Sequence, residues 1–111
     1  MRGLLSFALA LGAGGAVRAA APACKEAQAG LAARARISCR EARKTALAAA
    51  GKGRLHVRSA ELEEEQGKLV YSFDIERKGR GGIEEVLVDA STGEVVSVAH
   101  ETAAAEAAER D

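Results

Sequence analysis

The sequence predicts an α+β domain in which one N-terminal helix packs on a four-stranded antiparallel meander. Three observations predict this fold class. A capping box at residues 38–41 opens a helical segment, stretches of alternating apolar and polar residues follow it, and a turn at residues 89–93 joins the last two stretches into a hairpin.

Residues 1–23 have the pattern of a secretory signal peptide. A positive residue follows the first Met, and the apolar run at 4–17 is shorter than the roughly 20 residues that cross a bilayer comfortably. The small residues Ala21-Pro22-Ala23 favour cleavage before Cys24; cleavage after Ala19 and a retained short anchor are the alternatives. No other segment could span a membrane, so we expect a periplasmic or secreted protein. Cleavage leaves 88 residues (111 − 23), enough for one small domain.

Cys24 and Cys39 are the two cysteines of the chain. In an oxidising compartment, an even count permits one disulfide, and closing a loop of about 15 residues would stabilise the domain by roughly 3 kcal/mol. The bridge would tie residues 24–36, expected to be a frayed helix or leader segment, to the domain. Two alternatives stay open. Cys24 could be the lipid-anchored first residue of a lipoprotein, although the branched apolar residue usual three positions earlier is missing. The two thiols could also be free or pair between molecules.

The helix is predicted to begin after Ser38 and to end near Ala50. Glu41 follows Ser38 at the capping-box spacing, Ile37 is placed as a hydrophobic staple, and Gly51 supplies the stop. Its small and apolar residues recur at spacings of three and four, which lets one face lie close to a sheet. These residues are Ala42, Ala46, Leu47 and Ala50.

Four strands are expected after the helix. In the first, residues 54–64, the apolar parity slips by one, which predicts a bulge near Arg58-Ser59. The second, residues 69–77, alternates most cleanly and should be central. The glycine-rich stretch 78–82 is predicted to be a mobile loop before the hairpin that completes the sheet at residue 101.

The hairpin turn is defined by Asp89 and Gly93. The Asp89 carboxylate can accept backbone N–H bonds from the next residues, and Gly93 can adopt a positive φ, as in a type I turn followed by a glycine bulge. Residues 37–101 therefore form the expected domain. The alanine- and glutamate-rich tail at 102–111 is predicted to be a fraying helix or disordered.

Charge divides the chain after the leader into two halves. Residues 24–58 carry nine Lys or Arg and two Glu, hence +7, whereas residues 59–111 carry five Lys or Arg and fourteen Asp or Glu, hence −9. The sheet face away from the helix is expected to be wet, and it is either simply solvated or a partner-binding face. Its acidic residues are Glu61, Glu63, Asp74, Glu76 and Glu85.

Catalytic and cofactor motifs are missing from the sequence. His56 and His100 have no metal-ligand partners at helical or hairpin spacing, and Glu84 and Glu85 are adjacent in a strand, so their side chains point to opposite faces. A basic patch interleaved with aromatic residues is also missing, which argues against nucleic acid as a partner. We expect a monomeric, non-enzymatic protein without a cofactor or metal.

The order of these elements resembles the PepSY domain, a small bacterial module. The resemblance covers about residues 37–101 and is carried by Glu41-Ala42, by Gly67-Lys68-Leu69-Val70-Tyr71 and by the stretch VDASTGEV at 88–95. PepSY domains occur in propeptides of thermolysin-like metallopeptidases and in small secreted proteins, and the family has been proposed to inhibit peptidases. The resemblance implies no catalytic residues. No peptidase domain follows in this sequence, so inhibition would act in trans.

Two functions follow as hypotheses. In the first, the protein is an envelope binding module that inhibits or regulates a secreted or periplasmic peptidase through an exposed sheet edge or the acidic face. In the second, it is an envelope interaction or sensing module for a protein partner or a cation, unrelated to proteolysis. The first rests mostly on family analogy.

Overall fold

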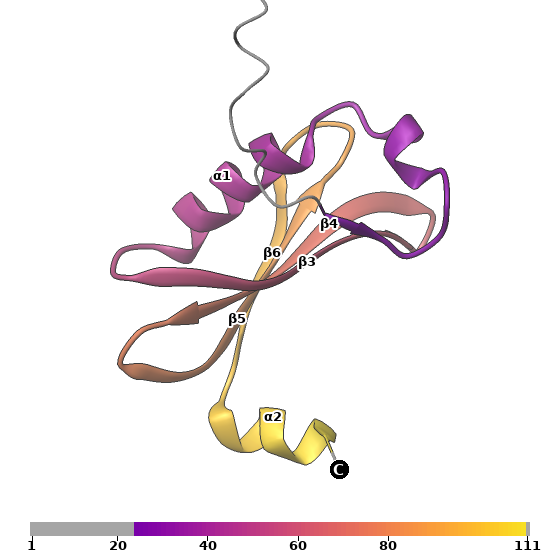
Figure 1. Ribbon diagram of the computed structural model, residues 1–111. Coiled ribbons are helices and arrows are strands. Elements are labelled where there is room, and N and C mark those ends of the chain that lie inside the picture. Colours follow the sequence, from indigo (N-terminus) through magenta and orange to yellow (C-terminus); the bar gives the residue numbers. More distant parts are fainter. Residues whose placement is uncertain (1–23, 111) are drawn as a thin grey trace, which may run out of the picture.

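The computed structural model describes residues 24–110; the predicted leader at 1–23 lies outside them. One sheet with the strand order β2-β3-β4-β5-β6 forms the centre of the domain, and α1 lies on one of its faces (Figure 1). No helix in the described part is long and apolar enough to cross a membrane. The elements in chain order are β2 (Lys25–Glu26), η3 (Leu31–Arg34), α1 (Cys39–Ala50), β3 (Leu55–Glu65), β4 (Lys68–Arg77), β5 (Arg80–Asp89), β6 (Val95–Glu101) and α2 (Ala103–Arg110).

The α+β class is confirmed, but the sheet has five strands and is mixed. Strands β3 to β6 form the expected antiparallel meander, and the predicted bulge lies between Val57 and Ser59. The additional strand, β2, pairs with β3 in parallel, and the Ala27 N–H donates to the Leu62 carbonyl at 2.9 Å. The expectation of a frayed helix at 24–36 is therefore wrong. Leu31 is only 4 % exposed, so a tertiary contact orders this segment in place of local helix propensity.

Helix α1 begins as the sequence predicts. The Ser38 hydroxyl accepts from the Glu41 N–H at 3.0 Å, and the Glu41 carboxylate accepts from the Ser38 N–H at 2.9 Å, which completes the capping box. Ala42 and Ala46 are fully buried against the sheet. Their small side chains allow close packing of the helix over the central strand, where Phe73 is also fully buried.

The described residues form one hydrophobic core. Its buried hydrophobic residues run from Leu31 to Ala90, and both cysteines of the disulfide are partly buried and pack against them. The phenolic hydroxyl of Tyr71 is satisfied at the edge of this core, where it donates to the Ile37 carbonyl at 2.8 Å. A chain of residues 24–111 is therefore expected to fold as a unit.

The stretch 78–82 is not the mobile loop that its glycines predict. Strand β5 already begins at Arg80, so the connection from β4 is reduced to Lys78 and Gly79. Gly82 lies within β5 at a φ of +92°, where an added Cβ would be 2.2 Å from the Glu101 carbonyl oxygen. Here glycine permits close backbone approach between two strands and does not indicate mobility.

The C-terminal tail forms the helix α2, which contacts β5 on the sheet face opposite α1 (Figure 1). The Thr102 hydroxyl accepts from the Ala105 N–H at 3.1 Å at its start. Ile83, which shares this face with Glu85, is only 3 % exposed. The expectation that this whole face is wet is therefore wrong at the end that α2 covers.

Candidate functional site

The five acidic residues predicted as a partner face do lie on one side of the sheet. Asp74 pairs directly with Glu85, and the register places Glu61 and Glu63 on the same side, further along β3. They do not form one open surface, however. Asp74 and Glu85 border a hollow whose other wall includes Thr102 and Ala105 of the C-terminal segment.

Glu76, the fifth of these residues, accepts from the Arg58 guanidinium at 3.2 Å. Because the ion pair is exposed on both sides, its contribution to stability is small. The pair nevertheless neutralises Glu76, which therefore adds little negative charge to the face. On the same side of β3, Glu61 and Glu63 of the predicted face are followed by Glu65, which the prediction did not include. These three residues are called the acidic row.

Glu63 lies in the middle of the acidic row. Burial is the main cause that raises the pKa of Glu63 to about 7, and the negative charge of Glu61 adds to the shift, as do contacts with Glu65. Two cations lie beside the row: Lys25 is opposite Glu61, and Lys68 is opposite Glu65 but is 3.7 Å from the Asp89 carboxylate. The ends of the row are thus partly compensated and its middle is not.

A pH dependence of stability follows from Glu63. Its pKa is about 7 in the folded protein against 4.5 ordinarily, so the folded state binds more protons between these values. The contribution of Glu63 to the free energy of unfolding should therefore be most favourable below pH 4.5 and should be lost as the pH rises towards 7. We expect Glu63→Gln to stabilise the domain at pH 8 by up to about 1 kcal/mol, since solvent screens a partly exposed group. Thermal melts at pH 5 and pH 8 measure this, and an equal pH dependence in the variant would contradict it.

Asp89 and Gly93 build the hairpin turn. The Asp89 carboxylate accepts from the Ser91 N–H at 2.7 Å and from the Thr92 N–H at 3.0 Å. These backbone bonds, assisted by the charge of Lys68, lower the pKa of Asp89. Gly93 has a φ of +83°, and its N–H donates to the Asp89 carbonyl. Asp89 and Gly93 therefore determine the backbone conformation of the turn, and we assign neither of them a catalytic role.

The cysteines and histidines are placed as follows. Cys24 and Cys39 form a disulfide with an S–S distance of 2.05 Å, which joins the residue before β2 to the first residue of α1. A lipid on Cys24 would require the free thiol, so the disulfide and the lipid anchor are alternative states of this residue.

His56 is exposed, and His100 Nδ1 lies 2.9 Å from a Glu84 carboxylate oxygen. Within residues 24–110, no group of three or more His, Cys, Asp or Glu side chains could hold a metal ion.

The feature that sequence reasoning missed is the valine edge, defined as Val95, Val96 and Val98 of β6. Strand β6 pairs with β5 on one side and is the last strand of the sheet on the other. The three valines are 39–46 % exposed and are the exposed large hydrophobic residues of the described part. The uncharged run VVSVA at 95–99 was the available signal, because outer strands usually carry charges that block pairing with other chains. The opposite edge of the meander is partly covered by β2.

Fold and surface together define a small α+β domain with an open sheet edge at β6 and without a recognisable catalytic constellation in the described residues. The family model named "Peptidase propeptide and YPEB domain", PepSY, matches residues 36–99. Because this match covers more than half of the chain, the protein belongs to the PepSY family. No curated protein and no solved structure matches the chain. PepSY domains are typically non-catalytic, usually extracellular or periplasmic, and generally linked to peptidase propeptides or regulation.

Proposed function

We propose that this protein is a non-enzymatic envelope module that restrains a secreted or periplasmic peptidase by placing β6 in its substrate groove. The observation that carries the proposal is the valine edge. Many partners bind an extended strand by strand addition, in which main-chain hydrogen bonds give affinity and alternate side chains enter pockets. An outer strand with exposed valines, such as Val96 and Val98, supplies both.

The way β6 is held favours inhibition over cleavage. Val86 pairs with Val98 and Glu84 with His100, so the inner side of β6 is hydrogen-bonded along most of its length. A strand fixed in this way loses little conformational entropy when it binds. Such a strand also resists the backbone distortion that a peptidase imposes on a substrate. The peptide bond of β6 that lies in the substrate groove would therefore stay intact.

The test measures peptide hydrolysis by peptidases of the envelope fraction with and without residues 24–111. We expect at least one peptidase to be slowed, and Val96→Lys/Val98→Lys to reduce that inhibition at least tenfold, because charged side chains would replace the apolar ones that enter the pockets of the groove. The matched control Ser97→Lys/Ala99→Lys adds the same charge to the same strand on its other face. It should retain most of the inhibition. No slowed peptidase, or full inhibition by the valine variant, would contradict the proposal.

The acidic row favours a second candidate, an envelope sensing module that binds a cation or a basic protein partner and is unrelated to proteolysis. Burial, and after it the negative charge of Glu61, raises the pKa of Glu63, so holding three carboxylates on one side of β3 is unfavourable and a nearby positive charge would relieve it. Within residues 24–110 the row does not form a group that could hold a metal ion, so a cation would be attracted by the charge of the row alone. Calorimetric titration with Ca²⁺ and Mg²⁺ tests the cation version. Affinity weaker than about millimolar, with no shift in melting temperature, would remove it.

A further inference from the structure

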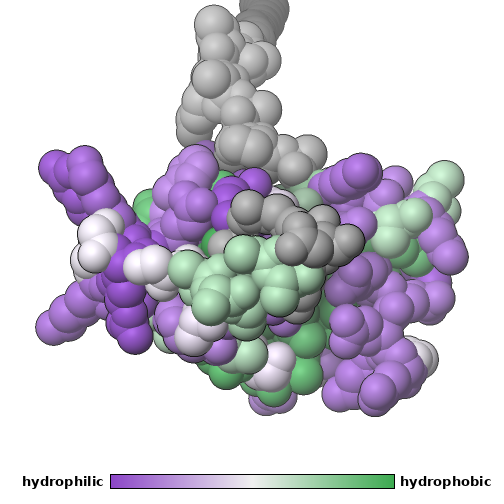
Figure 2. All heavy atoms as spheres, turned by 90° about the horizontal axis from the view of Figure 1, so that it is seen from below, coloured by the Kyte–Doolittle hydropathy of each residue, from purple (hydrophilic) through white to green (hydrophobic). Residues whose placement is uncertain are grey.

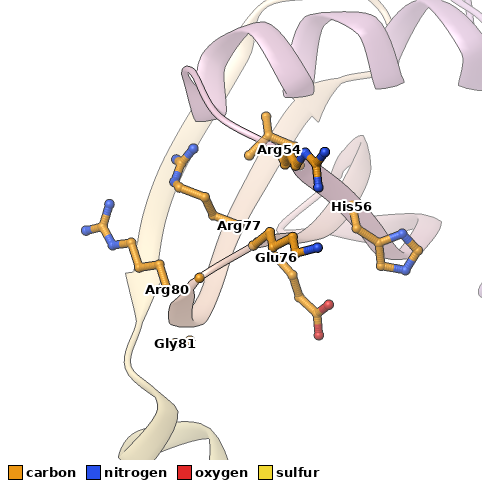
Figure 3. Close-up of a pocket in the computed structure, with 10 residues that line it drawn as sticks. Arg54, His56, Glu76, Arg77, Arg80 and Gly81 are labelled. Carbon is orange, nitrogen blue, oxygen red and sulfur yellow. The ribbon is translucent and has the colours of Figure 1, made fainter.

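Two neighbouring loops bring four cationic side chains to one end of the sheet. The loop from α1 to β3 contributes Lys52 and Arg54, the connection from β4 to β5 contributes Lys78, and Arg80 follows as the first residue of β5. Figure 3 shows Arg54 and Arg80 at this end of the sheet. These four residues are called the basic tip. The Lys78 N–H donates to the Arg54 carbonyl at 2.9 Å, which fixes the two loops side by side.

Arg77 belongs to the same end of the sheet but has a structural task. Its guanidinium donates to the Ala50 carbonyl at 2.7 Å and also to the Lys52 carbonyl. It thus satisfies the C-terminal end of α1 and anchors the loop that carries Lys52 and Arg54. Because Arg77 is used in this way, the basic tip is held in place by the fold even though its four side chains are exposed.

The charge of the basic tip is not compensated. Within the described part of the chain, its four side chains form no ion pair, and Glu76, the acidic residue lining the hollow at this end, is paired with Arg58. The guanidinium groups of Arg54 and Arg80 point apart and do not converge on a common centre (Figure 3). Spread cations of this kind suit an extended anionic surface better than a single small anion.

The surroundings of the basic tip argue against a protein as its partner. Protein interfaces are anchored by apolar or aromatic residues at their centre. The exposed large hydrophobic residues of the described part are the valines of β6, and none belongs to the basic tip. A phospholipid surface is bound by charge alone and requires no such anchor.

The acidic row lies at the other end of the same strand. Strand β3 runs from Leu55, next to the basic tip, to Glu65, a length of about 30 Å at roughly 3.3 Å per residue. Glu61, the residue of the acidic row nearest to the basic tip, lies six residues from Leu55, about 20 Å at roughly 3.3 Å per residue. This distance is more than twice the Debye length of about 8 Å at physiological salt. Hydrophilic residues gather at opposite ends of the face seen in Figure 2, with apolar residues between them. A negatively charged surface would therefore attract the basic tip without strongly repelling the acidic row.

We propose that the basic tip docks end-on to a membrane surface rich in anionic phospholipids, with headgroup phosphates as its ligands. Each Lys or Arg near such a surface strengthens binding roughly fivefold, so four together give a gain of several hundredfold. Docking in this orientation leaves the outer edge of β6 accessible. The inference is independent of the proposed peptidase, because it concerns different residues and a different ligand.

The experiment uses vesicle co-sedimentation of residues 24–111, with the disulfide formed. Vesicles of phosphatidylcholine with about 30 mol % phosphatidylglycerol are compared with phosphatidylcholine alone, at about 0.05 M and 0.5 M salt. We expect binding to the anionic vesicles only, and its loss at high salt. The tip variant combines Lys52→Gln, Arg54→Gln, Lys78→Gln and Arg80→Gln. The matched control removes four exposed cations elsewhere, through Lys25→Gln, Arg36→Gln, Arg40→Gln and Lys44→Gln.

The two variants have the same net charge, so only the position of the charge differs between them. The tip variant should lose at least tenfold in affinity, and the control should lose less than threefold. Circular dichroism melts verify that both are folded. Equal losses in the two variants, no binding of the wild type to anionic vesicles, or binding to soluble heparin without binding to vesicles would overturn the proposal.

Discussion

Replacing Cys24 and Cys39 with serine will lower the free energy of unfolding by about 3 kcal/mol. The disulfide closes a loop with a sequence separation of 15, and the chain-entropy account gives about this value for such a loop. For a domain of this size, the loss corresponds to a fall in Tm of roughly 12–24 °C. The effect is large because this small domain has a limited core and depends on such a covalent link.

The effect should be greatest at the covered edge of the sheet. Strand β2 is only two residues long, so the disulfide and the buried Leu31 are its main anchors. Hydrogen exchange of the Ala27 amide, bonded to the Leu62 carbonyl, should accelerate more than exchange in β4. Reductant should destabilise the wild type to the same extent and leave the serine variant unchanged. Equal melting temperatures of the oxidised and reduced wild type would refute this prediction.

Gly82→Ala will destabilise the domain by about 3 kcal/mol, although it adds a single methyl group. At a φ of +92°, an L-residue is strained by roughly 1–2 kcal/mol. In addition, the new Cβ would lie 2.2 Å from the carbonyl oxygen of Glu101, a backbone atom that cannot move without disturbing β6. The pairing of Ile83 with Glu101 would be lost first.

Gly79→Ala is the matched control for this substitution. Gly79 also has a positive φ, of +83°, but no atom lies within 4 Å of an added Cβ. Its replacement should therefore cost only the conformational strain, about 1 kcal/mol. Urea denaturation of both variants separates the two contributions. If the two substitutions destabilise the protein equally, close approach of the strands is not the reason for glycine at position 82.

The elements that could be predicted are those with short-range signals. Ser38 and Glu41 form their capping box within one helical turn, so the start of α1 depends only on neighbouring residues. Asp89 likewise bonds to amide groups two and three residues away. The bulge after Val57 could be predicted because the alternation of apolar residues in β3 shifts by one position there.

The interaction surfaces depend on contacts that no short window of sequence contains. The parity of β3 correctly predicted a common side for Glu61 and Glu63, but not the covering of that face near Ile83 by α2. Whether the valines of β6 are buried or exposed depends on the position of β6 in the sheet, because the same alternation is typical of an inner and an outer strand.

The sequence by itself determined the α+β class, the helix, the meander and the closing hairpin, since capping, alternation and turn chemistry act between near neighbours. Tertiary structure alone decided three other features. It ordered residues 24–36 as a disulfide-tethered parallel strand and turn, placed Gly82 against Glu101, and assembled the basic tip from two loops more than 20 residues apart. These features arise from long-range packing, in which buried area and close approach override local propensity.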